Sequence, residues 1–333
     1  MLNAEFLCLW EPATLERRQQ IARELGRFAR ATGDPQVEFL SGFFAAYCQA
    51  ECGDLDGSRS RLLELGPLID TTKNQYFAFL TERLVLSIDM RRCVPGVQDR
   101  VDGLLQRFNP THADTDGTWA LQTGLLAYQA GTLDQMLHAL QAMTAGTKAK
   151  TWTAAHAIAL LWAGDLDGAE EILDRNSDNP RNYFWMAVAQ ASAEVAAGLG
   201  RRDHCRQMFD ELLPYRGRVG ITGGGSLCFG LVSRSLDMLA LALDDLPVAV
   251  DILSEAVEQA DRIGALFDAV AGRRLLATAL LASESVDRAH TLIADALDVA
   301  ERQCFTREIK LIRALAASAS AVGSGDGCPD RFR

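Results

Sequence analysis

Apolar and polar residues alternate with the period of an α-helix along most of this chain. From Leu246, apolar side chains recur at three- and four-residue steps as far as Ile263, and charged residues occupy the positions between them. Such a stripe predicts an amphipathic helix with one buried and one solvated face. Gly264 follows as the expected C-terminal cap. No strictly alternating apolar run is long enough to predict a sheet, so the expected fold class is all-α.

A short turn rich in glycine and acidic residues separates successive helical stretches. The clearest copies are residues 164–169 and 244–249. Others begin at Gly53, Gly131, Gly200 and Glu284, and a degenerate copy lies in residues 91–96. From Gly131 onward the turns recur every 33 to 44 residues or so, near the tetratricopeptide period of about 34 residues. This predicts a right-handed α-solenoid of antiparallel helix pairs, in which each unit buries its apolar face against its neighbours.

Composition supports one helical-repeat domain and limits its partners. The chain has 333 residues, 48% of them hydrophobic, and a net charge of −11. We expect a single domain over residues 1–317 and a disordered tail over residues 318–333, where small, polar and glycine residues dominate. The negative charge argues against direct nucleic-acid binding and against an anionic membrane surface. No signal peptide or membrane span is predicted, and scattered cysteines without a Cys-x-x-Cys pair favour a cytoplasmic location.

One segment, residues 214–225, interrupts the helical rhythm with a run of glycines. Its candidate ligand-binding residues are Arg216, Arg218, Gly223, Gly224 and Gly225. Successive glycines ahead of a helix can turn backbone N–H groups toward an anion, and the two arginines would add positive charge. The alternative interpretation is that the glycines let two helices approach closely after a long connection.

Aromatic residues gather in the middle repeats. If the solenoid forms a groove for a partner, we expect Trp152, Trp162, Tyr183 and Trp185 to line it, because such side chains bury a large area at little entropic cost. The alternative is that they fill gaps between helices.

The sequence offers no catalytic constellation. Gly-x-Ser-x-Gly and His-Glu-x-x-His are both absent, and the five histidines stand apart from one another. We therefore expect neither catalytic residues nor a metal site nor a cofactor.

The glycine segment also carries a family resemblance. The run Leu212–Arg218, followed by Gly223–Gly230, resembles the C-terminal helical-repeat region of actinobacterial STAND ATPase regulators, which are linked to adenylate cyclase domains or to LuxR-type DNA-binding domains. Leu9-Trp10 and the Gly53-Asp54 turn fit the same region. The resemblance implies MalT-like repeats. The sequence contains no Walker motifs, no metal-binding aspartate pair of an adenylate cyclase and no LuxR-type domain. The resemblance therefore applies only to the helical-repeat region.

Two functional hypotheses follow from the repeats and the resemblance. The first is a non-catalytic scaffold or sensor arm that mediates protein–protein interaction in signalling or transcriptional regulation, with a protein or peptide partner in its groove. The second is a small-molecule-sensing regulatory domain that acts with an ATPase or adenylate cyclase partner. The first predicts a wide groove with exposed anchors, and the second an enclosed pocket with a few polar groups.

Overall fold

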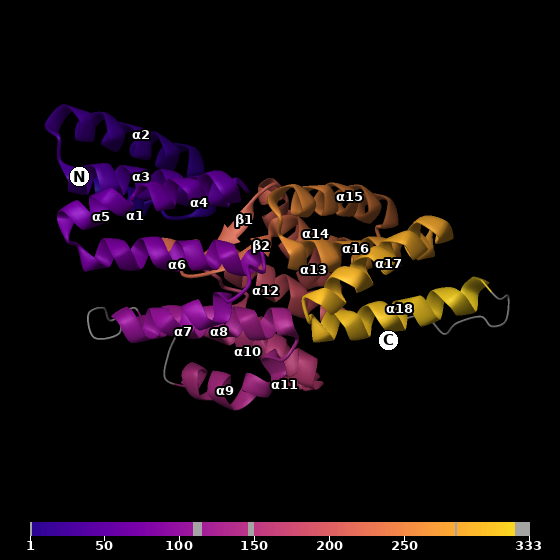
Figure 1. Cartoon of the computed structure of the whole chain (residues 1–333). Coiled ribbons are helices and arrows are strands. Elements are labelled where there is room, and N and C mark those ends of the chain that lie inside the picture. Colours follow the sequence, from indigo (N-terminus) through magenta and orange to yellow (C-terminus); the bar gives the residue numbers. More distant parts are fainter. Residues whose placement is uncertain (1, 109–114, 146–149, 284, 324–333) are drawn as a thin grey trace.

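The computed structural model describes residues 2–108, 115–145, 150–283 and 285–323. These residues are mostly α-helical, which confirms the expected all-α class at that coarse level. In Figure 1 the N-terminal helices lie at the upper left and the C-terminal helices on the right. Helix α6 lies below the other N-terminal helices, and a short hairpin of two strands, β1 and β2, lies between the N-terminal and C-terminal helices.

The helices follow one another through short turns. The N-terminal elements are α1 (Leu2–Cys8), η1 (Pro12–Thr14), α2 (Leu15–Thr32), α3 (Pro35–Glu51), α4 (Leu55–Glu64), α5 (Gly66–Thr72) and α6 (Gln75–Arg91). The middle elements are α7 (Val97–Phe108), α8 (Thr115–Ala130), η2 (Leu133–Met136), α9 (Leu137–Ala145), α10 (Lys150–Ala163), α11 (Leu166–Asn176), α12 (Trp185–Gly198) and α13 (Arg202–Leu212). The C-terminal elements are η3 (Leu213–Tyr215), β1 (Val219–Ile221), η4 (Gly223–Gly225), β2 (Cys228–Leu231), α14 (Val232–Ala242), α15 (Leu246–Ile263), α16 (Leu266–Ala282), α17 (Val286–Arg302) and α18 (Thr306–Gly323).

The recurring turns within the described residues do end one helix and precede the next, as the sequence pattern predicts, and Glu284, which begins one predicted turn, lies outside them. At Gly53 and Gly164 the backbone has a φ of 85°, a left-handed conformation that glycine adopts without steric cost. The following acidic residue then caps the new helix, since the Asp165 carboxylate accepts a hydrogen bond of 3.0 Å from the N–H of Gly168. Asp54 caps α4 in the same way.

Helices that are distant in sequence also come together. The α3–α4 turn at Gly53 approaches Gln259 of α15, since a Cβ built on Gly53 would lie 3.4 Å from Gln259 Nε2. Gly131, which follows α8, approaches the first turn of α18, where its Cβ would lie 2.5 Å from the backbone nitrogen of Arg307. These approaches place C-terminal helices beside N-terminal and middle ones.

The glycine-rich segment forms a buried antiparallel hairpin, although the sequence pattern predicted no strands. Val219 pairs with Leu231 and Ile221 with Cys228, and every residue of both strands is buried. The hairpin contacts α3, α6, α12 and α14. Its strands are too short to show an alternating pattern, and burial on both faces makes them uniformly apolar apart from glycine.

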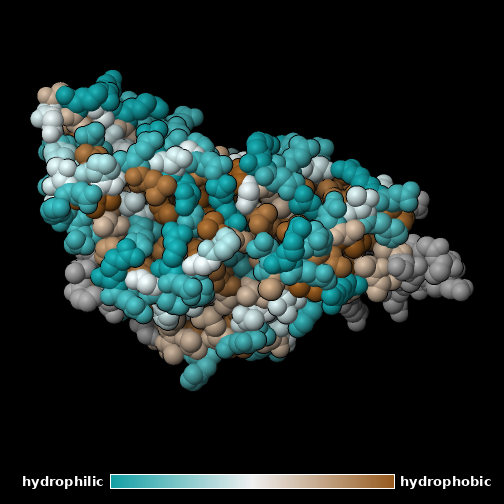
Figure 2. Space-filling model, viewed as in Figure 1, coloured by the Kyte–Doolittle hydropathy of each residue, from teal (hydrophilic) through white to brown (hydrophobic). Residues whose placement is uncertain are grey.

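Helix α18 extends to Gly323, so residues 318–323 of the predicted tail are helical, and residues 324–333 lie outside the described part. Within the described ranges, no helix is both long and apolar enough to cross a membrane. The face shown in Figure 2 is mostly hydrophilic, and hydrophobic residues are visible in a band across its middle.

Candidate ligand-binding site

The glycines of the hairpin pack against helix α6. Arg83 Nε donates a hydrogen bond of 2.7 Å to the carbonyl of Gly224, and Ser87 Oγ donates one of 2.7 Å to the carbonyl of Gly225. The N–H of Gly225 donates back to Thr222 within the turn. Side-chain donors thus satisfy carbonyls of a buried turn, as buried backbone requires. Gly223 begins the same short turn, η4.

Arg216 and Arg218 each have a carboxylate partner. Arg216 forms an ion pair with Glu255 on α15, where both side chains are largely exposed. Arg218 Nη1 lies 3.2 Å from Glu51 Oε1 and also donates to the carbonyl of Pro12, so it ties the hairpin to the N-terminal helices. Both candidate ligand-binding arginines therefore already pair with acidic groups of the protein itself.

The four candidate groove aromatics line four different cavities. Trp152 borders an apolar cavity and Trp162 a charged cleft. Trp185 is 1% exposed and lies under the Arg181 guanidinium, beside a polar cavity. Tyr183 is 47% exposed and borders a small hollow near the N-terminal helices. The structure does not bring these side chains together in one groove.

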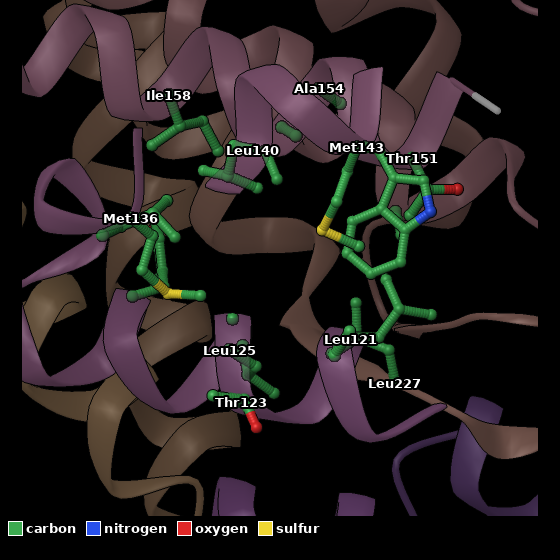
Figure 3. Close-up of a pocket in the computed structure, with 18 of the residues that line it drawn as sticks. Leu121, Thr123, Leu125, Met136, Leu140, Met143, Thr151, Ala154, Ile158 and Leu227 are labelled. Atoms are coloured by element: carbon green, nitrogen blue, oxygen red, sulfur yellow. The ribbon is translucent and has the colours of Figure 1, made fainter. Parts of the chain in front are cut away.

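The apolar cavity is the best-formed candidate site. It has a volume of about 200 Å³ and lies between α8, η2, α9, α10, α12 and the residues around β2. Figure 3 shows Leu140, Ala154 and Ile158 above the space, with Leu121 and Leu125 below it. Its walls include large side chains such as those of Trp119, Trp152, Met136 and Met143.

Small residues on the surrounding helices create the space. Gly124 of α8, Ala154 and Ala155 of α10, and Ala187 and Ala191 of α12 all line it. A Cβ built on Gly124 would meet no atom within 4 Å. The cavity therefore exists because no side chain at these positions is long enough to fill it.

Two buried threonine hydroxyls lie behind the lining and point away from the space. Thr123 Oγ1 and Thr151 Oγ1 are buried and have no hydrogen-bond partner among the described residues. Figure 3 places Thr151 beside Met143 at one end of the cavity and Thr123 near Leu125 on the opposite wall. Because the surface of the space is almost wholly apolar, it suits a small uncharged and largely apolar molecule.

Among the candidate site residues predicted from the sequence, only Trp152 lines this cavity. The small residues on α8, α10 and α12 resemble ordinary helix positions, and nothing in their spacing indicates a shared space.

Comparison with models of known protein families finds no match to the chain, and comparison with curated proteins finds no significant match.

Proposed function

We propose that this chain is a ligand-sensing helical-repeat domain, built as a right-handed α-solenoid of antiparallel helix pairs, that binds a small uncharged molecule in the apolar cavity. The observation that carries the proposal is the cavity itself, with about 200 Å³ of space and an almost wholly apolar lining. Small-molecule sites of proteins are concave and have predominantly apolar walls.

The size of the cavity limits the size of its ligand. An apolar cavity of about 150 Å³ accommodates benzene, so the space in this protein suits one ring with a short substituent.

The position of the cavity offers a route from binding to a response. Helix α9 packs against α10 and η2, while α8 and α12 form other walls of the same space. A molecule bound between them would add contacts that tie α9 to its neighbours and favour the ordered arrangement of these helices. We propose that this change is what a signalling partner reads, and the family resemblance points to an ATPase or adenylate cyclase as that partner.

This proposal is favoured over a peptide-binding groove because the candidate anchors are dispersed. A peptide scaffold needs its aromatic anchors on one accessible surface. Trp185 is almost fully buried, and Trp152 and Trp162 border different spaces.

Titration with acetophenone, an uncharged ring with one carbonyl acceptor, tests the proposal by calorimetry or ligand-observed NMR. We expect saturable binding to the unaltered protein, because the ring leaves water and fills apolar space. Gly124→Leu should weaken binding at least about tenfold by occupying the space. Gly103→Leu, a matched change on α7 with no atom within 4 Å of its Cβ, should leave binding unchanged. Equal binding by both variants, or none by the unaltered protein, would overturn the proposal.

A further inference from the structure

A second space, next to the apolar cavity, has the opposite chemistry. This cleft has a volume of about 300 Å³ and lies between α10, α12, α14, α16 and α18. Its charged lining consists of Glu194, Arg234, Arg274, Arg307 and Glu308. Tyr128 lines both spaces, so its ring belongs to the wall that they share.

The carboxylates of the cleft already have donors. Glu194 accepts hydrogen bonds from the hydroxyl of Tyr128 and, at 3.2 Å, from Trp162 Nε1. Glu308 accepts from Arg274 Nε at 2.6 Å and from Arg274 Nη2 at 3.1 Å. Both acidic groups are therefore engaged within the protein.

Positive groups of the cleft are engaged less completely. The guanidinium of Arg307 lies over the ring of Trp162, 4.3 Å from its centroid, and pairs with no carboxylate among the described residues. Arg234, whose side chain is 4% exposed, donates from Nη1 to the Tyr128 hydroxyl at 2.7 Å, but its Nη2 has no partner in the described part of the chain.

Behind the cleft, a buried carboxylate is shared between two arginines. Asp268 Oδ1 lies 2.5 Å from Arg91 Nη2 and 3.2 Å from Arg234 Nε. Burial opposes the charge of Arg234 most strongly, yet Tyr128, Asp268 and Glu194 outweigh it, so that the pKa of this guanidinium lies above its ordinary value. Arg234 therefore stays positive, and one more positive charge than negative charge surrounds the cleft.

We propose that this cleft binds a small carboxylate with an apolar body. The carboxylate would face Arg307, with Arg234 and Arg274 adding to the positive field, because guanidinium groups recognise planar anions by charge-assisted hydrogen bonds. The apolar body would lie against Leu161, Met238, Leu241, Phe267, Leu275 and Leu311, which share the lining. The ligand class differs from that of the apolar cavity, so this inference does not rest on the proposed function.

Phenylacetate and phenylacetamide test the inference as a pair, because they match in shape and differ in charge. Both are titrated into the Gly124→Leu variant, in which the leucine side chain takes up part of the apolar cavity and weakens binding of the ring there. We expect phenylacetate to bind at least about tenfold more tightly than the amide and to lose affinity as salt is added. Equal affinities, or no saturable binding of phenylacetate, would overturn the inference.

Two arginines on α18 provide a matched pair of variants. Arg307→Gln removes the unpaired guanidinium and should weaken phenylacetate binding about tenfold, while Arg307→Lys should lose less. Arg313→Gln makes the same charge change at an exposed position that pairs with Glu301, outside the cleft, and should bind as the parent does. Circular dichroism of each variant establishes that it is folded. Equal losses in Arg307→Gln and Arg313→Gln would mean a general charge effect and would contradict the cleft as the site.

Discussion

Replacing Gly124 with leucine should stabilise the protein, which is an unusual expectation for a residue facing the interior. Gly124 lies inside α8, and a Cβ at this position would meet no atom within 4 Å. Alanine at an interior helix position is about 1 kcal/mol more favourable than glycine because the unfolded chain loses less entropy. Gly124→Ala should therefore raise the free energy of unfolding by about that amount.

Leucine adds three carbon atoms beyond alanine, and those atoms would enter the apolar cavity. At about 0.8 kcal/mol for each buried CH₂ group, the added atoms contribute about 2 kcal/mol. The total expected gain for Gly124→Leu is about 3 kcal/mol. Gly103 on α7 supplies the control, because its Cβ also meets no atom, but it does not line the cavity. Gly103→Ala and Gly103→Leu should both gain only the helix term of about 1 kcal/mol.

Urea unfolding followed by far-ultraviolet circular dichroism measures these differences from the midpoint and the slope. The distinguishing quantity is the difference between the leucine and alanine variants at each site. We expect about 2 kcal/mol at position 124 and close to zero at position 103. If Gly124→Leu is no more stable than Gly124→Ala, the space cannot accept a side chain without strain, and the argument for an open apolar cavity fails.

Two further changes test the hairpin and a buried acid. Gly225→Ala should destabilise the protein by more than Gly96→Ala does, as measured by urea unfolding. Both glycines have positive φ, but of the two only Gly225 would place a Cβ 2.7 Å from Leu84. Equal losses of unfolding free energy would mean that the approach of Gly225 to α6 is not tight. Asp237→Asn should stabilise the protein at neutral pH. Burial raises the pKa of Asp237 well above its usual value despite nearby Arg234. In addition, neither carboxyl oxygen has a hydrogen-bond partner among the described residues. At this site the folded state then binds more protons than the unfolded state, so the contribution of Asp237 to stability should fall as pH rises above about 4, the ordinary aspartate pKa. Asp237→Asn should flatten that decline in unfolding measured across pH, and an unchanged slope would refute the assignment.

The helices and their turns could be predicted from sequence because their signals are local. A glycine follows the end of an apolar stripe at positions 53, 164 and 264. The structure confirms a helix end just before each of these glycines, and each has a positive φ. The aspartate caps that follow Gly53 and Gly164 depend on residues only a few positions away. Local patterns of this kind need no knowledge of the tertiary structure.

The hairpin and the cavity could not be predicted because they depend on contacts between distant segments. Gly224 needs to be small because Arg83, on α6, lies directly against it. The cavity arises where Gly124, Ala154 and Ala191 from three helices face one space, and each of these residues alone is an ordinary helix position. Sequence spacing carries no information about which small residues will meet.

A crystal structure of the protein with acetophenone bound tests the central claim most directly. We expect density for the ring between α8, α10 and α12, in contact with Leu140, Ala154 and Ile158. Density elsewhere on the protein, with the cavity unchanged, would contradict the claim that this space is the ligand site.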